Sequence, residues 1–263
     1  MPRQRIALGL EYDGSSFEGW QTQAHGRTIQ DTLERALALF ADEPLATVCA
    51  GRTDAGVHGR GQVVHFDTTR ERALNAWVRG VNRYLPPSVA VRWSRSVPET
   101  FHARYSAQWR HYEYWIHNDP VRSPLLDRRA GWVFRPLDPQ AMQAAANLLL
   151  GTHDFSAFRS AQCQARTPVR TLNRCEVLPA SASLLRLRFT ANAFLHHMVR
   201  NLVGALVEVG VGRREPAWVG EILDARDRSR GAATFGPDGL YFAGVEYDPA
   251  FRLPVGGEDL FLP

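Results

Sequence analysis

The spacing of apolar and polar positions predicts alternating strands and helices in the first part of the chain. A period of two predicts strands at 5–12, 47–50, 62–67 and 89–97, and a period near 3.6 predicts helices at 28–40 and 71–84. Thr28 and Asp31 form a capping-box-like start, because a carboxylate three residues on can reach back to the cap N–H. This β-α-β-β-α-β order is typical of the split βαβ arrangement, an antiparallel or mixed sheet with helices on one face.

The second part of the chain loosely repeats this plan. Strands are predicted at 109–117, 170–178, 184–191 and 241–247, and helices at 138–150, 193–209 and 215–225. Asp138 is a suitable cap with Pro139 in the first turn, and the mostly apolar helix at 193–209 is expected to be buried. The predicted fold class is α+β, with two split βαβ domains, 1–106 and 107–263, meeting near residues 100–110.

Composition and charge reduce the range of functions that the sequence is compatible with. No window reaches the roughly 18 apolar residues of a membrane span, the N-terminus lacks the apolar core of a signal peptide, and three cysteines give no disulfide framework. A cytoplasmic protein is expected. All 31 basic residues are arginine, whose planar fork suits phosphate. The net charge of +4 permits nucleic-acid binding without requiring it.

The sequence motifs support neither a metal site nor a nucleotide-binding loop. The adjacent His196 and His197 would point to different sides of a helix, and the spacings of zinc sites are missing. The turn from Gly51 to Gly56 lacks the lysine of a phosphate-binding loop, and there is no Gly-x-Ser-x-Gly nucleophile elbow. The sequence predicts neither a metal nor a cofactor.

The stretch GRTDAGVHGRGQVVHF at residues 51–66 is the first candidate for carboxylate chemistry. Asp54 lies in a glycine-bracketed turn, two residues after Arg52. One interpretation is a surface Asx turn; the other is a catalytic carboxylate, because a neighbouring arginine keeps such a group ionised and fixes its direction.

Two further segments bear on this choice. Arg110, Tyr112 and Tyr114 share one face of a predicted strand, where a tyrosine can stack an unpaired RNA base beside a guanidinium; the alternative is that both tyrosines are core. Arg200 lies in the apolar helix and needs a partner there, for which Asp54 is a candidate.

Together these segments resemble the tRNA pseudouridine synthase A family along nearly the whole chain. The matching motifs, in order, are YDGSSFEGWQ at 12–21, GRTDAGVH at 51–58, FHAR at 101–104, RHYEY at 110–114, QCQARTP at 162–168, the helix at 194–204 and PDGLY at 237–241. His111 departs from the pattern, which usually has a second basic residue there; this weakens any phosphate contact at that position.

The resemblance implies the roles of the candidate residues. Asp54 is the expected nucleophile, Tyr112 contacts the target base, Arg200 pairs with the catalytic carboxylate, and Leu240 lines the uracil pocket. Members of the family are homodimers without a metal or cofactor, and they convert uridine to pseudouridine at positions 38 to 40 of the tRNA anticodon arm. The two domains, both ferredoxin-like, would then meet at a central catalytic cleft. The N-terminal domain would carry Asp54, and the C-terminal domain would complete the cleft and the dimer interface.

Several alternatives stay open on the sequence. Asp54 would attack either the ribose C1′ or the uracil C6, and Tyr112 is either the base that removes the C5 proton or a stacking surface. The expected RNA-backbone contacts are Arg52, Arg104, Arg166 and Arg170, with Arg110 beside the target base. The rival functions are a non-catalytic RNA-binding module of the same fold and a metal-dependent hydrolase.

Overall fold

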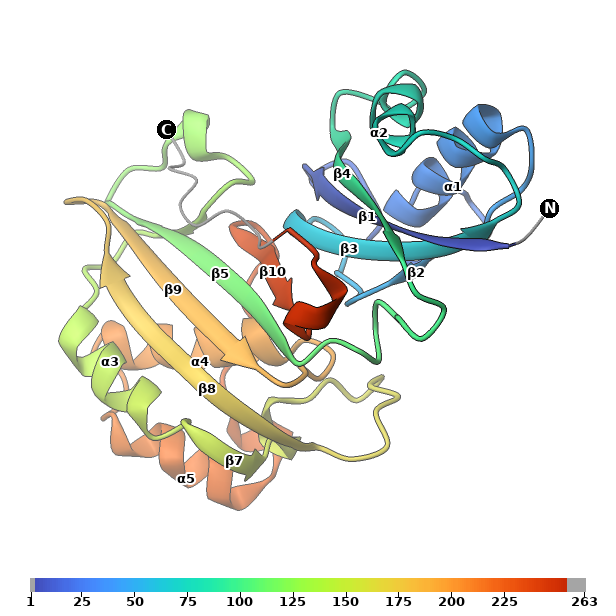
Figure 1. Ribbon diagram of the computed structural model, residues 1–263. Helices are drawn as coiled ribbons and strands as arrows, with labels where there is room; N and C mark the ends of the chain where they lie inside the picture. The colour runs from blue at the N-terminus through green and yellow to red at the C-terminus, as the bar shows by residue number, and fades with distance from the viewer. Residues whose placement is uncertain (1–2, 255–263) are drawn as a thin grey trace. The chain divides into compact units, whose positions relative to one another are not determined.

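The computed structural model describes residues 3–254. Its contacts divide the chain into two compact units, each drawn in Figure 1. Unit 1 comprises the chain up to Trp109 together with the segment from Phe242 onward, and unit 2 comprises Arg110–Tyr241. The end of the predicted C-terminal domain, 255–263, lies outside the described residues.

Unit 1 combines a sheet with two helices. In chain order its elements are β1 (Gln4–Tyr12), α1 (Ile29–Ala41), β2 (Val48–Cys49), β3 (His58–Thr68), α2 (Leu74–Asn82), β4 (Val89–Val97) and β10 (Leu240–Glu246), the last beginning at the end of unit 2. The strands follow the order β4-β1-β3, and both β2 and β10 also pair with β3. β1 is antiparallel to β3 and β4, and β2 is antiparallel to β3.

The core of unit 1 lies between the two helices and one face of this sheet. Alternate residues of β1, among them Ile6 and Leu8, pack with Leu33 of α1 and with Trp77 of α2. The predicted helix start is confirmed: the Thr28 hydroxyl accepts a hydrogen bond from the N–H of Asp31 at 3.2 Å. This apolar layer gives the loops at the sheet edge a rigid base.

Unit 2 also combines a sheet with helices. In chain order its elements are β5 (Trp109–Asn118), β6 (Gly131–Val133), α3 (Pro139–Asn147), β7 (Gly151–Asp154), β8 (Val169–Pro179), β9 (Leu184–Ala191), α4 (Met198–Gly210) and α5 (Ala217–Ala225). The order β5-β9-β8-β7 is antiparallel throughout, and β6 lies parallel to β5. α3 packs on β8 and contacts α4 and α5, and α4 is buried around most of its circumference.

One predicted helix starts in the wrong place. The helix expected at 193–209 begins only at Met198. His197 has a left-handed backbone with φ 62°, a conformation that cannot continue an α-helix. The residues before it therefore form a turn, and the rings of His196 and His197 lie 4.0 Å apart at their centroids instead of on different sides of a helix.

The α+β fold class is confirmed at the level of mixed, largely antiparallel strands with five α-helices among the described residues. The strands β6 and β7 were not predicted. Within residues 3–254 no helix is long and apolar enough to cross a membrane.

Candidate active site

Asp54 lies in the loop between β2 and β3, and the base of this loop is fixed by backbone pairing. The N–H of Ala50 donates to the carbonyl of Val63 at 2.8 Å. The Gln62 amide donates to the carbonyl of Gly51 at 2.6 Å. The chain entering the turn is therefore held to β3 at two successive residues before the carboxylate is reached.

The residue before Asp54 anchors the turn to the core. The hydroxyls of Thr53 and Tyr12 lie 2.9 Å apart in a buried hydrogen bond, and the N–H of Trp20 donates to the carbonyl of Thr53 at 2.9 Å. Burial raises the pKa of Tyr12, while its hydrogen bonds to Thr53 and Gln62 act the other way. The tyrosine is therefore a neutral hydroxyl throughout the physiological range.

Two glycines let the preceding loop pack directly against this turn. A Cβ on Gly19, which has φ 87°, would lie 2.9 Å from the carbonyl oxygen of Thr53. A Cβ on Gly14 would lie 1.9 Å from the carbonyl oxygen of Val57. These contacts explain why the glycines of the YDGSSFEGWQ segment accompany the GRTDAGVH turn: only a residue without a side chain allows this approach.

The residues of the turn differ in their exposure to solvent. Thr53 is buried, Asp54 is half-buried and Arg52 is exposed. The carbonyl of Asp54 accepts from the N–H of Val57 at 3.2 Å, which closes the turn. The carboxylate is thus carried by fixed backbone and still reaches the surface, as a nucleophile requires.

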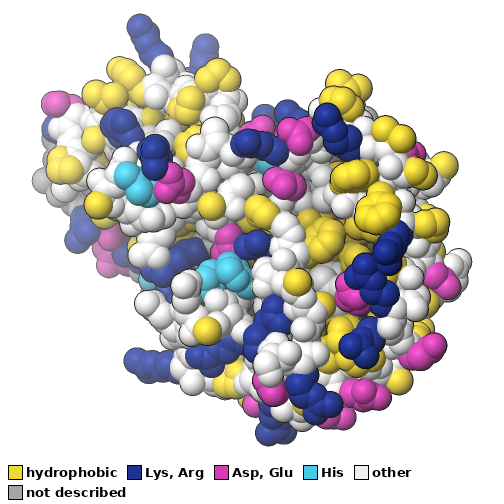
Figure 2. All heavy atoms as spheres, turned by 180° about the vertical axis from the view of Figure 1, so that it is seen from behind, with side chains coloured by type: hydrophobic (Ala, Val, Ile, Leu, Met, Phe, Trp, Pro, Cys, Tyr) yellow, Lys and Arg dark blue, Asp and Glu magenta, His cyan; other side chains and the backbone are white. Residues whose placement is uncertain are grey.

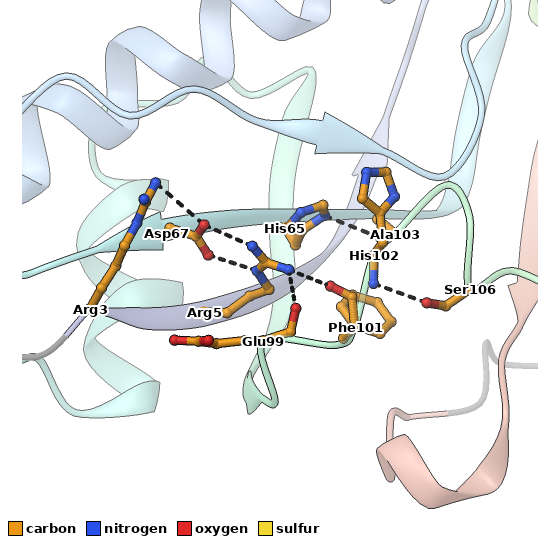
Figure 3. Close-up of polar contacts among 9 residues, drawn as sticks. All are labelled: Arg3, Arg5, His65, Asp67, Glu99, Phe101, His102, Ala103 and Ser106. Atoms are coloured by element: carbon orange, nitrogen blue, oxygen red, sulfur yellow. Dashed lines mark hydrogen bonds and ion pairs between the residues drawn. The ribbon is translucent and has the colours of Figure 1, made fainter.

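The FHAR segment forms a second fixed loop in unit 1 (Figure 3). Arg5 binds both carboxylate oxygens of Asp67, at 2.7 and 2.8 Å, and donates to the carbonyl of Phe101 at 2.8 Å. The N–H of Ala103 donates to Nδ1 of His65 at 3.1 Å. Burial and the charge of Arg5 lower the pKa of His65 to about 4, which keeps this nitrogen an acceptor at neutral pH.

Tyr112 lies in unit 2 on β5, opposite Phe189 of β9. Its side chain is 9% exposed, and its ring meets that of Phe194 edge-on, with centroids 4.9 Å apart. Most of this tyrosine therefore belongs to the core, and only a small fraction of the residue is accessible to solvent. The neighbouring His111 hydrogen-bonds the Thr190 hydroxyl at 2.9 Å.

Tyr114 supports the turn that carries Leu240. Its hydroxyl donates to the carbonyls of Gly236, at 3.0 Å, and of Asp238, and burial raises its pKa. Leu240 itself is buried, and its N–H donates to the carbonyl of Pro237 at 3.0 Å. Of the two interpretations of these tyrosines, the core one holds for Tyr114.

Arg200 lies in the first turn of α4 and is half-buried. Its Nε donates to the carbonyl of Phe235 at 2.8 Å, and the N–H of Phe235 donates back to the carbonyl of Arg200 at 3.2 Å. This reciprocal pair fixes the guanidinium against the 235–240 segment. It also supplies part of the hydrogen bonding that a charged side chain needs in apolar surroundings.

The chain is similar to known proteins along most of its length. The family model described as tRNA pseudouridine synthase matches residues 10–106 and 145–248. The chain is 56% identical over 257 residues to tRNA pseudouridine synthase A of Janthinobacterium sp. (strain Marseille), covering 95% of this chain and 94% of the relative. The enzyme of the same name from Burkholderia multivorans is 59% identical over 250 residues, covering 95% and 92%.

The chain belongs to the tRNA pseudouridine synthase A family. It is therefore an isomerase that converts uridine to pseudouridine in tRNA. Asp54, Arg200 and Leu240 fall within the residues that match the family model, whereas Tyr112 lies between the two matched ranges.

The predicted RNA-binding arginines of this synthase are spread over both units. Arg52 and Arg104 are exposed on unit 1, and Arg166 is exposed on unit 2. Arg170 is half-buried and donates to the carbonyls of Thr167 and Val169, at 2.9 and 2.6 Å. Figure 2 shows small groups of arginines separated by acidic and apolar side chains on the visible face.

Sequence reasoning missed an arginine-lined pocket in unit 2. The pocket has a volume of about 400 Å³ and is lined by Ser156, Arg159, Ser160, Ala161, Arg226, Asp227 and Arg228. Arg228 donates to Oδ1 of Asn201 at 3.2 Å, the residue that follows Arg200. Nothing in the spacing of these arginines indicated a pocket, because Arg159 lies far along the chain from Arg226 and Arg228.

The candidate residues thus fall into two groups. Asp54, Arg52 and Arg104 lie in unit 1, and Tyr112, Arg110, Arg166, Arg170, Arg200 and Leu240 lie in unit 2. Arg110 donates to the carbonyl of Asn192 at 2.7 Å. The pairing of Asp54 with Arg200 stays a prediction.

Proposed function

We propose that this synthase modifies uridines 38, 39 and 40 in the tRNA anticodon stem-loop, with Asp54 as its nucleophile. The observation that carries the proposal is the construction of the Asp54 turn. Thr53 is hydrogen-bonded to Tyr12 and Trp20 in the core, while the carboxylate next to it stays half-exposed. A nucleophile on a rigid base loses little freedom when it reacts, which lowers the entropic part of the barrier.

The reaction needs one carbon–nitrogen bond to break and one carbon–carbon bond to form. In one course the Asp54 carboxylate attacks the ribose C1′ and the uracil leaves through N1. In the other it adds to the uracil C6, and the N1–C1′ bond then breaks. In both, the base turns, C5 bonds to C1′, the carboxylate departs, C5 loses its proton to a base and N1 gains one. The net change is an isomerisation that consumes no co-reactant.

The other candidate residues take supporting roles in this proposal. Tyr112 contacts the target uracil, and its hydroxyl is a candidate for removing the C5 proton. Arg200 pairs with the catalytic carboxylate, which keeps that group ionised. Leu240 provides an apolar wall for the uracil. The reciprocal Arg200–Phe235 hydrogen bonds and the Tyr114 hydroxyl support this placement by fixing the segment around Leu240.

RNA binding in this proposal rests on dispersed arginines. Arg52, Arg104, Arg110, Arg166 and Arg170 contact the phosphate backbone or flank the target base. The target uridine leaves the anticodon stack to react, which costs less in a loop than in a duplex. Because the substrate is tRNA, we place the reaction in the cytoplasm.

We further propose the domain arrangement that the family resemblance implies. Two ferredoxin-like domains, 1–106 and 107–263, enclose a central catalytic cleft, and two copies of the chain form a homodimer through the second domain. In unit 1 the strand order β4-β1-β3, the antiparallel pairing of β2 with β3 and the two helices support the ferredoxin-like assignment of the first domain. Sedimentation equilibrium of the full chain measures the oligomeric state.

Product mapping tests the substrate assignment. Transcribed tRNAs carry a uridine at only one of positions 38, 39 and 40, and a matched control tRNA carries none of the three. After incubation, nuclease digestion and nucleoside chromatography count the pseudouridine formed. We expect pseudouridine in the three test tRNAs and none in the control. Pseudouridine at other sites only would overturn the anticodon assignment.

A further inference from the structure

Tyr105 is a large aromatic side chain that the structure holds almost fully in solvent. It is 76% exposed, yet its ring lies nearly parallel to that of His102, with centroids 4.2 Å apart and 27° between the planes. The guanidinium carbon of Arg104 lies 5.7 Å from the centroid of the Tyr105 ring. An exposed tyrosine ordinarily samples several rotamers, so a ring stacked on a second ring is an oriented surface.

The ring beneath Tyr105 is fixed by the backbone around it. Nδ1 of His102 accepts from the N–H groups of Arg104, at 3.2 Å, and Tyr105, at 3.1 Å. The N–H of His102 donates to the Ser106 hydroxyl at 3.0 Å, and the N–H of Ser106 donates back to the carbonyl of His102 at 2.9 Å. This loop is a small closed structure in which His102 serves as a base for Tyr105.

The loop is in turn fastened to the core of unit 1 (Figure 3). Ala103 makes two of these connections: its N–H donates to His65 at 3.1 Å, and its carbonyl accepts from the Tyr247 hydroxyl at 2.7 Å. Phe101 is fully buried, and Arg5 donates to its carbonyl. A mobile surface tyrosine would need none of these contacts.

The same contacts place the loop beside the strand that leads to Asp54. His65, which binds Ala103, stands opposite Val48 of β2 in the β2–β3 pairing. Burial raises the pKa of the thiol of Cys49, the last residue of β2, while the charges of Arg52 and Arg104 act the other way. The loop that carries Tyr105 is therefore joined, through His65 of β3, to the part of the sheet where β2 leads into the turn of Asp54.

We propose that Tyr105, stacked on His102, is a platform for an unpaired base of the bound tRNA, and that Arg104 contacts a phosphate next to that base. This inference rests on the proposed tRNA substrate and adds a contact outside the uracil pocket. Stacking on an aromatic ring tolerates any base, because every base has a π-face. The platform would hold the strand near the target uridine without specifying its sequence.

The surroundings of the ring favour a nucleotide over a second protein chain. Besides Tyr105, the exposed residues of the loop at 98–108 are Pro98, Glu99, Thr100, Arg104 and Gln108, so the Tyr105 ring lies in a mostly polar and charged segment. A stable protein interface needs a contiguous apolar centre. One aromatic face next to a guanidinium is instead the usual pairing for an unstacked RNA base and its phosphate.

Binding measurements with matched variants test the platform. The variants are Tyr105→Ala, Tyr105→Phe and Tyr84→Ala, the last removing another exposed tyrosine of unit 1. The probe is an anticodon stem-loop RNA with 2-aminopurine placed at one unpaired position at a time. We expect Tyr105→Ala to raise the Kd by about 5- to 100-fold, while Tyr105→Phe and Tyr84→Ala leave it within about two-fold. One 2-aminopurine position should lose its quenching in Tyr105→Ala alone.

The outcomes separate this inference from the proposed function. If Tyr105→Ala binds and isomerises tRNA like Tyr84→Ala, the platform is wrong and the synthase assignment stands. If the unaltered protein neither binds nor isomerises tRNA, the substrate proposal itself fails. If Tyr105→Ala changes only the oligomeric state in sedimentation, the ring contacts a second copy and the platform is also overturned. Thermal melting of each variant confirms that it is folded.

Discussion

The buried hydroxyls of Tyr12 and Thr53 lie 2.9 Å apart, one residue before Asp54. This hydrogen bond joins β1 to the turn that carries the proposed nucleophile. We expect Tyr12→Phe to cost about 1–3 kcal/mol of unfolding free energy, because it leaves the Thr53 hydroxyl unsatisfied. The same change should lower kcat by about 10-fold or more with little effect on KM, because the turn loses its anchor while the tRNA contacts stay.

A double variant separates the hydrogen bond from the packing. Replacing Thr53 by Val in the Tyr12→Phe background removes both polar partners, so denaturant unfolding should recover part of the lost stability. If the double variant is destabilised by the sum of the two single changes, the two hydroxyls are not coupled and the anchor has no energetic role.

Gly19 and Gly26 provide a second test of how the Asp54 turn is held. Both have positive φ, 87° and 68°, but a Cβ on Gly26 meets nothing within 4 Å, whereas one on Gly19 meets the Thr53 carbonyl oxygen at 2.9 Å. Each alanine variant should lose about 1–2 kcal/mol from backbone strain. Gly19→Ala should lose more, and it alone should lose activity beyond its loss of stability. Equal effects in melting and turnover would contradict the proposed packing.

The low pKa of His65 in the fold predicts that the stability of the protein depends on pH. Its pKa falls from 6.5 in the unfolded chain to about 4 in the fold, mainly through burial, so between these values the unfolded chain binds more protons. The contribution of His65 to the free energy of unfolding is therefore fully present above pH 6.5. It decreases as the pH falls toward 4, by on the order of 2 kcal/mol. The pKa of His102 is lowered too, again first by burial, which adds to the same trend.

The His65→Asn variant isolates this contribution, because the amide oxygen can replace Nδ1 as acceptor for Ala103 without titrating. Urea unfolding between pH 4 and 7 should show a shallower pH dependence in the variant than in the unaltered protein. NMR titration of the His65 ring in the unaltered protein gives its pKa directly, and a value near 6.5 would contradict the account.

Tyr114 tests the support beneath Leu240. Tyr114→Phe removes a buried donor from the carbonyls of Gly236 and Asp238, so we expect a loss of about 1–3 kcal/mol and a higher KM for tRNA. The control is Tyr241→Phe, whose hydroxyl donates to the Arg129 carbonyl at 3.0 Å in an exposed setting and whose loss water can replace. If Tyr114→Phe and Tyr241→Phe change KM equally, the turn that carries Leu240 has no specific role in substrate binding.

The elements that sequence patterns predicted best are those whose side chains alternate between core and solvent. β4 and β9 match their predicted residues, and α1 starts at the cap that Thr28 indicated. β6 and β7 have three and four residues, too few to establish a period. The start of α4 was misplaced because Phe194 and Leu195 are apolar and extend the helical pattern, while the positive φ of His197 leaves no mark in the sequence.

The candidate site was predictable wherever a residue's chemistry is tied to a local motif. Asp54 belongs to such a turn, and its glycines and strand context could be interpreted from neighbouring positions. Tyr105 directly follows the FHAR motif but was overlooked, because its significance depends on the ring of His102 beneath it. One partner of Arg200 in the fold, the carbonyl of Phe235, lies 35 residues away, and no spacing rule predicts such a contact.

The central claim is that Asp54 is the nucleophile of an isomerisation that exchanges the C5 proton of uridine. The most direct measurement uses anticodon-arm tRNA with tritium at the uridine C5, mixed with the unaltered protein, Asp54→Asn or the unaltered protein plus chelator. We predict tritium release by the unaltered protein, unchanged by chelator, and none by Asp54→Asn, which should still bind tRNA. Release by Asp54→Asn at the unaltered rate, or no release by a protein that binds the tRNA, would contradict the account.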